Sequence, residues 1–153
     1  MKFIKPFIAF LIINFAALAI GSTFMAEGPK GDWYLQLEKA PWTPDGWVFG
    51  AAWTTIMICF SIYMAFLYLN KWTNKTILLF AIQFILNVSW NLFFFNQKLV
   101  DIGLINIILL TIIVFAFLFT YAKDLKLKSI LILPYALWLC IATSLNLYIL
   151  LHN

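Results

Sequence analysis

Five apolar stretches dominate the chain, and each is long enough to cross a bilayer as a helix. A spanning helix needs roughly 20 consecutive apolar residues. Charged and turn-forming residues separate stretches of about that length, at 3–25, 47–70, 76–96, 100–121 and 129–151. No stretch alternates between apolar and polar residues over ten positions, as the strands of a membrane β-barrel do. The pattern predicts an all-α integral membrane bundle of five transmembrane helices.

The composition excludes a water-soluble globule. Of the 153 residues, 65% are hydrophobic and 10% are charged, and the mean hydropathy is +0.97. Such a chain has too little polar surface to cover a soluble domain. All connections after the first are only a few residues long, so neighbouring helices should pack antiparallel within one domain covering residues 1–153.

The first apolar stretch also has features of a secretory signal peptide. Lys2 and Lys5 precede its uninterrupted apolar part, and Ala17-Leu18-Ala19 resembles a small-residue cleavage site. The apolar residues nevertheless continue to Met25, which is far enough to span a membrane and favours a retained helix. The position of the mature N-terminus distinguishes the two interpretations.

The lysines are distributed unevenly between the two ends of the predicted bundle. Seven of the ten basic residues lie at the N-terminus or in the second and fourth connections: Lys2, Lys5, Lys71, Lys75, Lys123, Lys126 and Lys128. The positive-inside rule then predicts a cytoplasmic N-terminus and a C-terminus outside. The net charge of +4 follows this asymmetry, and the chain has no Arg, so no nucleic-acid partner is expected.

The first connection, residues 26–46, faces outward in this topology and has an unusual composition. Its segment from Trp33 to Pro44 carries two Trp, a Tyr and two Pro. Such residues are costly to expose to water unless the loop folds onto a surface or a ligand. We therefore expect a structured lid over the bundle.

Polar and aromatic residues recur at helical spacing inside the third stretch. Asn87, Trp90 and Asn91 follow an i, i+3, i+4 pattern and share one face, which Phe94 extends by a turn. An amide in hydrocarbon needs a hydrogen-bond partner, and either a neighbouring helix or a bound molecule can supply it. The spacing does not distinguish these two possibilities.

Two other stretches contribute similar residues. Trp138, Ala142 and Asn146 stack at i, i+4 and i+8, and Trp53 lies in the second stretch. At about 1.5 Å per residue, Asn87 and Trp138 lie near the midplane and the others lie beneath the lid. These positions predict a mostly apolar pocket for a flat aromatic ligand.

Other kinds of site have little support in the sequence. His152 has no neighbouring Cys or Asp, so no metal site is expected, and Cys59 and Cys140 lie within apolar stretches as small hydrophobic residues. No Asp, Glu, Lys or Arg lies in the middle of a predicted helix, where a secondary transporter would need a coupling charge.

The order and spacing of these motifs resemble the TspO/MBR family of tryptophan-rich sensory proteins and translocator proteins, also called peripheral-type benzodiazepine receptors. The matching motifs span essentially the whole chain: Trp33-Tyr34, Leu37-Glu38-Lys39, Pro41-Trp42-Thr43-Pro44, Gly50, Trp53, Leu86-Asn87, Trp90, Pro134-Tyr135, Leu137-Trp138, Ala142-Thr143 and Leu145-Asn146. The resemblance implies a five-helix membrane fold, commonly a homodimer. It also implies a pocket for porphyrins such as protoporphyrin IX and for isoquinoline or benzodiazepine-type ligands, with no obligatory cofactor.

The resemblance also implies ligand-binding residues. These are Tyr34, Trp42, Pro44, Trp53, Asn87, Trp90, Phe93, Trp138, Ala142 and Leu145. Trp53 and Trp138 would flank the ligand, and Asn87 would supply a polar contact.

The chain departs from the family pattern at three points. The usual Lys-Pro-x-Trp-x-Pro-Pro reads Lys39-Ala40-Pro41-Trp42-Thr43-Pro44-Asp45, so one proline has moved and the second of the final pair is Asp45. The family's proposed cholesterol element needs a Lys or Arg after a Tyr, but none follows Tyr148, so cholesterol is not expected as a ligand. Small-residue pairs that can support a dimer occur at Ala17/Gly21 and Gly46/Gly50, but the third stretch contains no Gly.

Three functions of different classes fit these features. The leading hypothesis is a membrane receptor or sensor for tetrapyrroles and other flat apolar ligands. The second is light- and oxygen-dependent degradation of porphyrin, with Trp53 or Trp138 as the candidate reactive residue, because the sequence offers no other acid, base or nucleophile set. The third is a transporter of apolar molecules, which the missing coupling charge disfavours.

Overall fold

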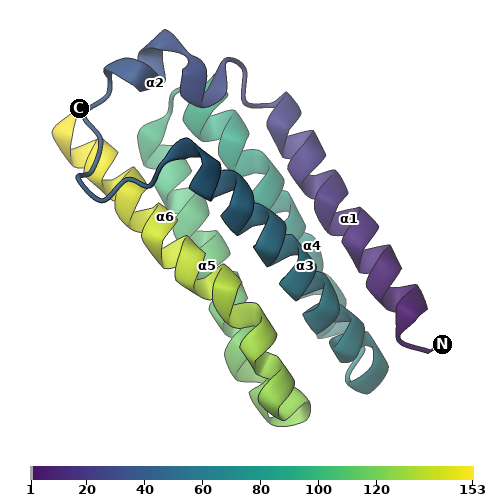
Figure 1. Ribbon diagram of the computed structural model, residues 1–153. Helices are drawn as coiled ribbons and strands as arrows, with labels where there is room; N and C mark the ends of the chain where they lie inside the picture. The colour runs from purple at the N-terminus through teal and green to yellow at the C-terminus, as the bar shows by residue number, and fades with distance from the viewer. Residues whose placement is uncertain (1) are drawn as a thin grey trace.

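Long helices packed side by side make up the protein. The computed structural model describes residues 2–153, and within that range it contains helices and no strand. The five long helices are α1 (Ile4–Thr23), α3 (Gly46–Asn70), α4 (Asn74–Asn91), α5 (Val100–Leu125) and α6 (Leu133–His152). The two ends of the chain lie at opposite ends of the bundle (Figure 1). The all-α bundle predicted from the sequence is confirmed.

Four continuous helical stretches of the described chain are long and apolar enough to cross a membrane: Ile4–Lys30, Gly46–Asn70, Asn74–Asn96 and Val100–His152. The last stretch has 53 residues because the backbone stays helical through η3 (Lys126–Ile132). It nevertheless contains two spans, since the chain reverses near Lys126, where φ is +52°, and α6 returns alongside α5. The five predicted spans thus correspond to five helices.

Local chemistry explains where two of these helices begin. At the start of α4, the Thr73 Oγ1 accepts a hydrogen bond from the Thr76 backbone N–H at 3.3 Å, and the Thr76 hydroxyl lies 3.4 Å from the Thr73 N–H. This reciprocal cap satisfies two donors that the first turn leaves free. Pro134 lies in the first turn of α6, where its missing N–H is tolerated. Helix α5 continues to Leu125, past the expected end at residue 121.

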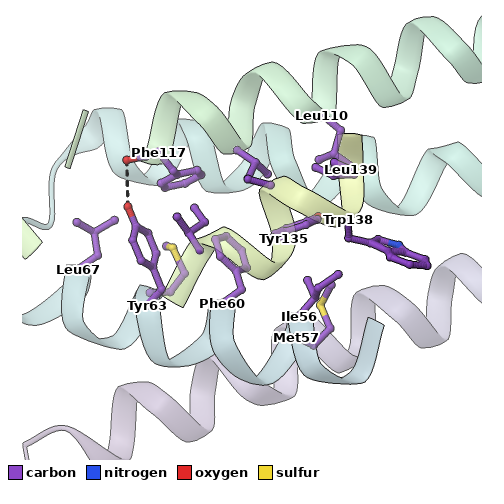
Figure 2. Packing of buried hydrophobic residues seen from close by; sticks show 14 of the residues in the cluster. Ile56, Met57, Phe60, Tyr63, Leu67, Leu110, Phe117, Tyr135, Trp138 and Leu139 are labelled. Carbon is purple, nitrogen blue, oxygen red and sulfur yellow. Dashed lines mark hydrogen bonds between the residues drawn. The ribbon is translucent and has the colours of Figure 1, made fainter. Parts of the chain in front are cut away.

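Aromatic residues fill the half of the bundle away from the lid. Phe60, Tyr63, Phe117 and Tyr135 are almost fully buried and pack mostly edge to face (Figure 2). The Tyr63 hydroxyl donates to the Phe117 carbonyl at 3.0 Å, so the one polar atom of that ring is paired inside the core. The cavity described below lies in the opposite half of the bundle.

The lid contains two short helices, η1 (Gly28–Lys30) and α2 (Asp32–Gln36), and lies across one end of the bundle (Figure 1). It packs on the π-helix η2 (Leu92–Asn96), which continues α4. The Tyr34 ring lies 5.3 Å from the Phe95 ring, and the Trp33 ring lies 5.8 Å from the Phe94 ring. The lid is therefore structured by aromatic packing, as its composition predicts.

Candidate ligand-binding cavity

A cavity of about 440 Å³ lies between the helices beneath the lid. Its volume falls within the roughly 300–1,000 Å³ that is usual for small-molecule sites. The lid and all five long helices contribute to its wall. The lining residues are Ala17, Leu18, Gly21, Ser22, Met25, Pro29, Tyr34, Lys39, Thr43, Pro44, Gly46, Phe49, Trp53, Asn87, Trp90, Asn91, Phe94, Phe95, Ile107, Leu110, Leu139, Ala142, Leu145, Asn146 and Ile149.

Asn87 is the most informative polar group of this wall. Its side chain is buried, and its Nδ2 has no hydrogen-bond partner among the described residues. A buried amide donor without a partner costs about 1–3 kcal/mol. Asn87 lines the cavity while its Nδ2 is itself shielded, so an acceptor on a bound molecule can recover that energy once the amide turns toward it.

Trp90 is held in one orientation on the same wall. Its Nε1–H donates to the Asn146 Oδ1 at 3.2 Å, and the Asn146 Nδ2 donates to the Val100 carbonyl at 3.1 Å. The indole also stacks on the Phe94 ring, with centroids 4.8 Å apart and planes 13° apart. A flat hydrophobic surface is thus presented to the cavity with its polar atom already paired.

The π-helix η2 determines which phenylalanines reach the cavity. A π-helix has a wider turn than an α-helix, so residues after its start shift around the helix axis. Phe94 and Phe95 are both buried and line the cavity. Phe93, which the resemblance implied as a binding residue, is partly exposed and not among the lining residues.

The lid contributes Tyr34, Thr43 and Pro44 to the cavity wall. Burial raises the pKa of the Tyr34 hydroxyl above its usual value, so this group is neutral at physiological pH and can donate a hydrogen bond. The Thr43 N–H donates to the Ala40 carbonyl at 2.9 Å, which closes a tight turn.

Trp42 lies outside the cavity, on the outer surface of α6. Its side chain is 54% exposed, its Nε1–H donates to the Ser144 Oγ at 3.1 Å, and its ring contacts Tyr148 edge to face. The turn at Ala40–Thr43 explains this position, because it directs Trp42 away from the bundle while Pro44 returns to the wall.

A second set of contacts fastens the lid to α6 at Glu38. The Glu38 backbone N–H donates to the Asn153 Oδ1 at 2.8 Å, and the Asn153 Nδ2 donates to the Glu38 carbonyl at 3.2 Å. The Tyr148 hydroxyl donates to the Glu38 Oε1 at 3.2 Å. We call Glu38, Tyr148 and Asn153 the lid clamp.

Trp138 also lies outside the cavity. Its side chain is 7% exposed, and its indole packs edge to face on Phe49, with ring centroids 5.3 Å apart. Phe49 and Leu139, not Trp138, line the cavity at this level. Trp138 is labelled in Figure 2 as part of the core.

The structure therefore brings together seven of the ten residues that sequence reasoning selected. Those on the wall are Tyr34, Pro44, Trp53, Asn87, Trp90, Ala142 and Leu145. Sequence reasoning did not select Ile107, Leu110 or the α1 residues, because an apolar residue on a membrane helix carries no signal that separates a cavity wall from ordinary packing. It also missed Phe95, because the pattern of apolar residues does not predict the π-turn that brings Phe95 to the cavity wall.

Gly21 has a different role from the one considered for it in the sequence. A Cβ on this residue would lie 3.1 Å from the Asn91 Nδ2. Because glycine has no Cβ, α1 can approach α4 closely here. Ala17 and Gly21 are buried and line the cavity, and they are not available to a second copy. A Cβ on Gly46 or Gly50 would meet no atom within 4 Å, so this second pair lies open.

Side chains suited to metal binding do not gather anywhere in residues 2–153: no three His, Cys, Asp or Glu residues come together. The wall offers hydrogen bonds, aromatic faces and one cation.

The bundle and its cavity define an integral, multi-pass membrane protein with an internal chamber suited to a small apolar molecule. Comparison with known sequences gives the family. The chain belongs to the TspO/MBR family, whose model matches residues 9–152.

Three relatives illustrate the breadth of this family. The tryptophan-rich protein TspO of Chlorobaculum tepidum is 34% identical, over 94% of this chain and 90% of its own. The tryptophan-rich sensory protein of Cereibacter sphaeroides is 26% identical, over 90% of this chain and 87% of its own. The human translocator protein is 28% identical, over 92% of this chain and 86% of its own.

Proposed function

We propose that this protein is a membrane receptor or sensor whose cavity binds flat, apolar, aromatic molecules, with tetrapyrroles such as protoporphyrin IX as the leading ligand class. The names of the sensory and translocator relatives support the general role. The wall supports the ligand class, because Trp53, Trp90, Phe94 and Phe95 offer aromatic surface on which a flat ring system can pack.

The unpartnered Nδ2 of Asn87 is the observation on which this proposal chiefly rests. Lipid tails have no hydrogen-bond acceptor in their hydrocarbon part, so a cavity filled by them would leave this buried amide donor unpaired at a cost in free energy. A ring nitrogen, carbonyl or ether oxygen of a bound ligand would accept its hydrogen bond. The proposed ligand is therefore apolar over most of its surface and carries an acceptor near its inner edge.

A titration of protoporphyrin IX in the dark tests the proposal. The protein is held in detergent or nanodiscs, and binding is followed by Trp fluorescence and porphyrin absorbance. We expect Asn87→Ala to weaken binding about tenfold, since a hydrogen bond in a desolvated site contributes about 0.5–1.5 kcal/mol.

Asn106→Ala is the matched control for that variant. Asn106 is an equally buried amide on α5 that donates to the Ser89 Oγ at 2.7 Å and does not line the cavity. The control should bind like the parent. Equal affinity of the parent and Asn87→Ala would contradict the proposed site, and failure of the parent to bind would contradict the ligand class.

Light-dependent degradation of a bound porphyrin is a second candidate, and the position of Trp53 favours it. The Trp53 indole lines the cavity, where it would lie against an excited ligand in the presence of oxygen. Trp138, the other indole considered for this role, does not line the cavity. Repeating the titration under illumination separates binding from degradation, because only degradation removes the porphyrin absorbance.

A further inference from the structure

Lys39 is the only charged side chain on the cavity wall among the described residues. It lies on the lid and is half-buried. Every other lining residue is apolar, aromatic or neutral and polar. A cation at the outer end of an otherwise apolar chamber indicates a particular kind of ligand.

The Lys39 ammonium has weak partners in the protein. Its Nζ lies 3.3 Å from each of the Leu35 and Leu37 carbonyl oxygens and 4.9 Å from the centroid of the Tyr34 ring. In the described chain, the one ion pair within 4 Å joins Lys71 to Asp124, at the other end of the bundle. Because an ammonium has three N–H donors and the protein accepts two, one donor remains for a ligand.

The neighbouring acid is held away from Lys39. The Glu38 carboxylate accepts a hydrogen bond from the Tyr148 hydroxyl on α6, and the Glu38 backbone is held on both sides by the Asn153 side chain. The lid clamp thus fixes two consecutive side chains in opposite roles. Glu38 fastens the lid to α6, and Lys39 faces the chamber without a carboxylate partner.

We propose that Lys39 selects ligands with a carboxylate at the edge of the ring system that lies under the lid. This inference rests on the proposed function and specifies its ligand class further. An N–H donor on a cation forms a shorter and stronger hydrogen bond to a carboxylate than to a neutral acceptor. The half-buried position strengthens the interaction because less water screens it. The resulting ligand is amphipathic: its acid lies at Lys39 and its neutral acceptor lies deeper, at Asn87.

Two forms of one ligand test this proposal. Protoporphyrin IX has two carboxylates, and its dimethyl ester keeps the same ring system without them. Both are titrated in the dark, in phosphatidylcholine nanodiscs, against the parent, Lys39→Met and Lys98→Met. We expect the parent to bind the acid more tightly than the ester, and Lys39→Met to reduce this acid-to-ester ratio about tenfold.

Lys98→Met is the matched control. Lys98 is at the same end of the bundle and lies 5.9 Å from the Trp33 ring centroid, but it is exposed and does not line the cavity. A general effect of surface charge on an anionic ligand would change the ratio in both variants. A specific effect leaves the ratio of Lys98→Met equal to that of the parent.

Comparing two ligands on one protein separates recognition from lid damage. A loosened lid weakens the acid and the ester together and leaves their ratio unchanged. Lys39→Arg keeps the charge and should keep most of the acid preference, and Lys39→Gln should lose it as Lys39→Met does. An unchanged ratio in both neutral variants would overturn the assignment of Lys39, whereas a parent that binds neither ligand would overturn the proposed function itself.

Discussion

At the scale of single residues, hydrogen-bond partners decide what each polar side chain does. The spacing of Asn87, Trp90 and Asn91 predicted a shared face, but it could not say which amide already has a partner. The structure separates their roles: Asn87 keeps a free donor, whereas Trp90 donates to Asn146. Trp138 shows the limit of the same reasoning, because it packs on the Phe49 ring of another helix and is not among the residues that line the chamber.

Asn146→Ala should destabilise the protein by about 1–2 kcal/mol. The change removes the acceptor of the Trp90 N–H and the donor to the Val100 carbonyl, and it leaves a partly buried indole nitrogen unpaired. Chemical unfolding in detergent, followed by circular dichroism, measures the effect.

Asn70→Ala is a suitable control for this variant, since the Asn70 amide bonds only to the Phe66 carbonyl at the exposed end of α3. Equal stability of the two variants would mean that Asn146 does not fix the indole.

At the scale of elements, the lid and the end of α4 depart most from what the sequence indicated. The lengths of the five helices followed from hydropathy, because a bilayer fixes how many apolar residues a span needs. The π-turn at Leu92–Asn96 and the lid clamp did not follow from hydropathy, because both depend on contacts between segments far apart in the chain. Glu38 and Asn153 are separated by 115 positions, and no local pattern predicts their hydrogen bonds.

Asn153→Ala should release the lid without unfolding the bundle. The variant loses both hydrogen bonds to the Glu38 backbone, so the Glu38 N–H becomes free to exchange with solvent. Hydrogen–deuterium exchange read by mass spectrometry should show exchange of residues 37–42 about tenfold faster, with α4 and α5 unchanged.

Leu151→Ala controls for a change near the end of α6, because Leu151 is 69% exposed. Exchange of the lid at the parental rate in Asn153→Ala would show that aromatic packing alone holds it closed.

At the scale of the whole molecule, the distribution of charge predicts the direction of insertion. The end opposite the lid carries seven of the ten lysines, and the lid end carries Lys30, Lys39 and Lys98. A lid facing outward remains the prediction of the positive-inside rule. The homodimer also stays a prediction. Of the two small-residue pairs, Gly46 and Gly50 are exposed, but Gly46 also lines the cavity.

Labelling of introduced cysteines tests the orientation. In a background with Cys59→Ala and Cys140→Ala, Gln36→Cys places a thiol on the lid and Leu127→Cys places one in the connection at the other end. A membrane-impermeant maleimide should label Gln36→Cys in intact cells and label Leu127→Cys only after permeabilisation. The reverse pattern would show that the lid faces the cytoplasm.

The chamber draws its wall from the first helix and the last, and this has a consequence for biosynthesis. Ala17 and Gly21 belong to α1 and are synthesised before the other long helices, whereas Ala142, Leu145 and Asn153 are synthesised after them. A nascent chain therefore has no complete binding chamber until α6 has been made. Asn14 on α1 likewise lacks its partner Ser61 until α3 has been made. Ligand present during synthesis can stabilise only finished molecules, so it should raise the yield of folded protein without changing the rate at which chains are inserted.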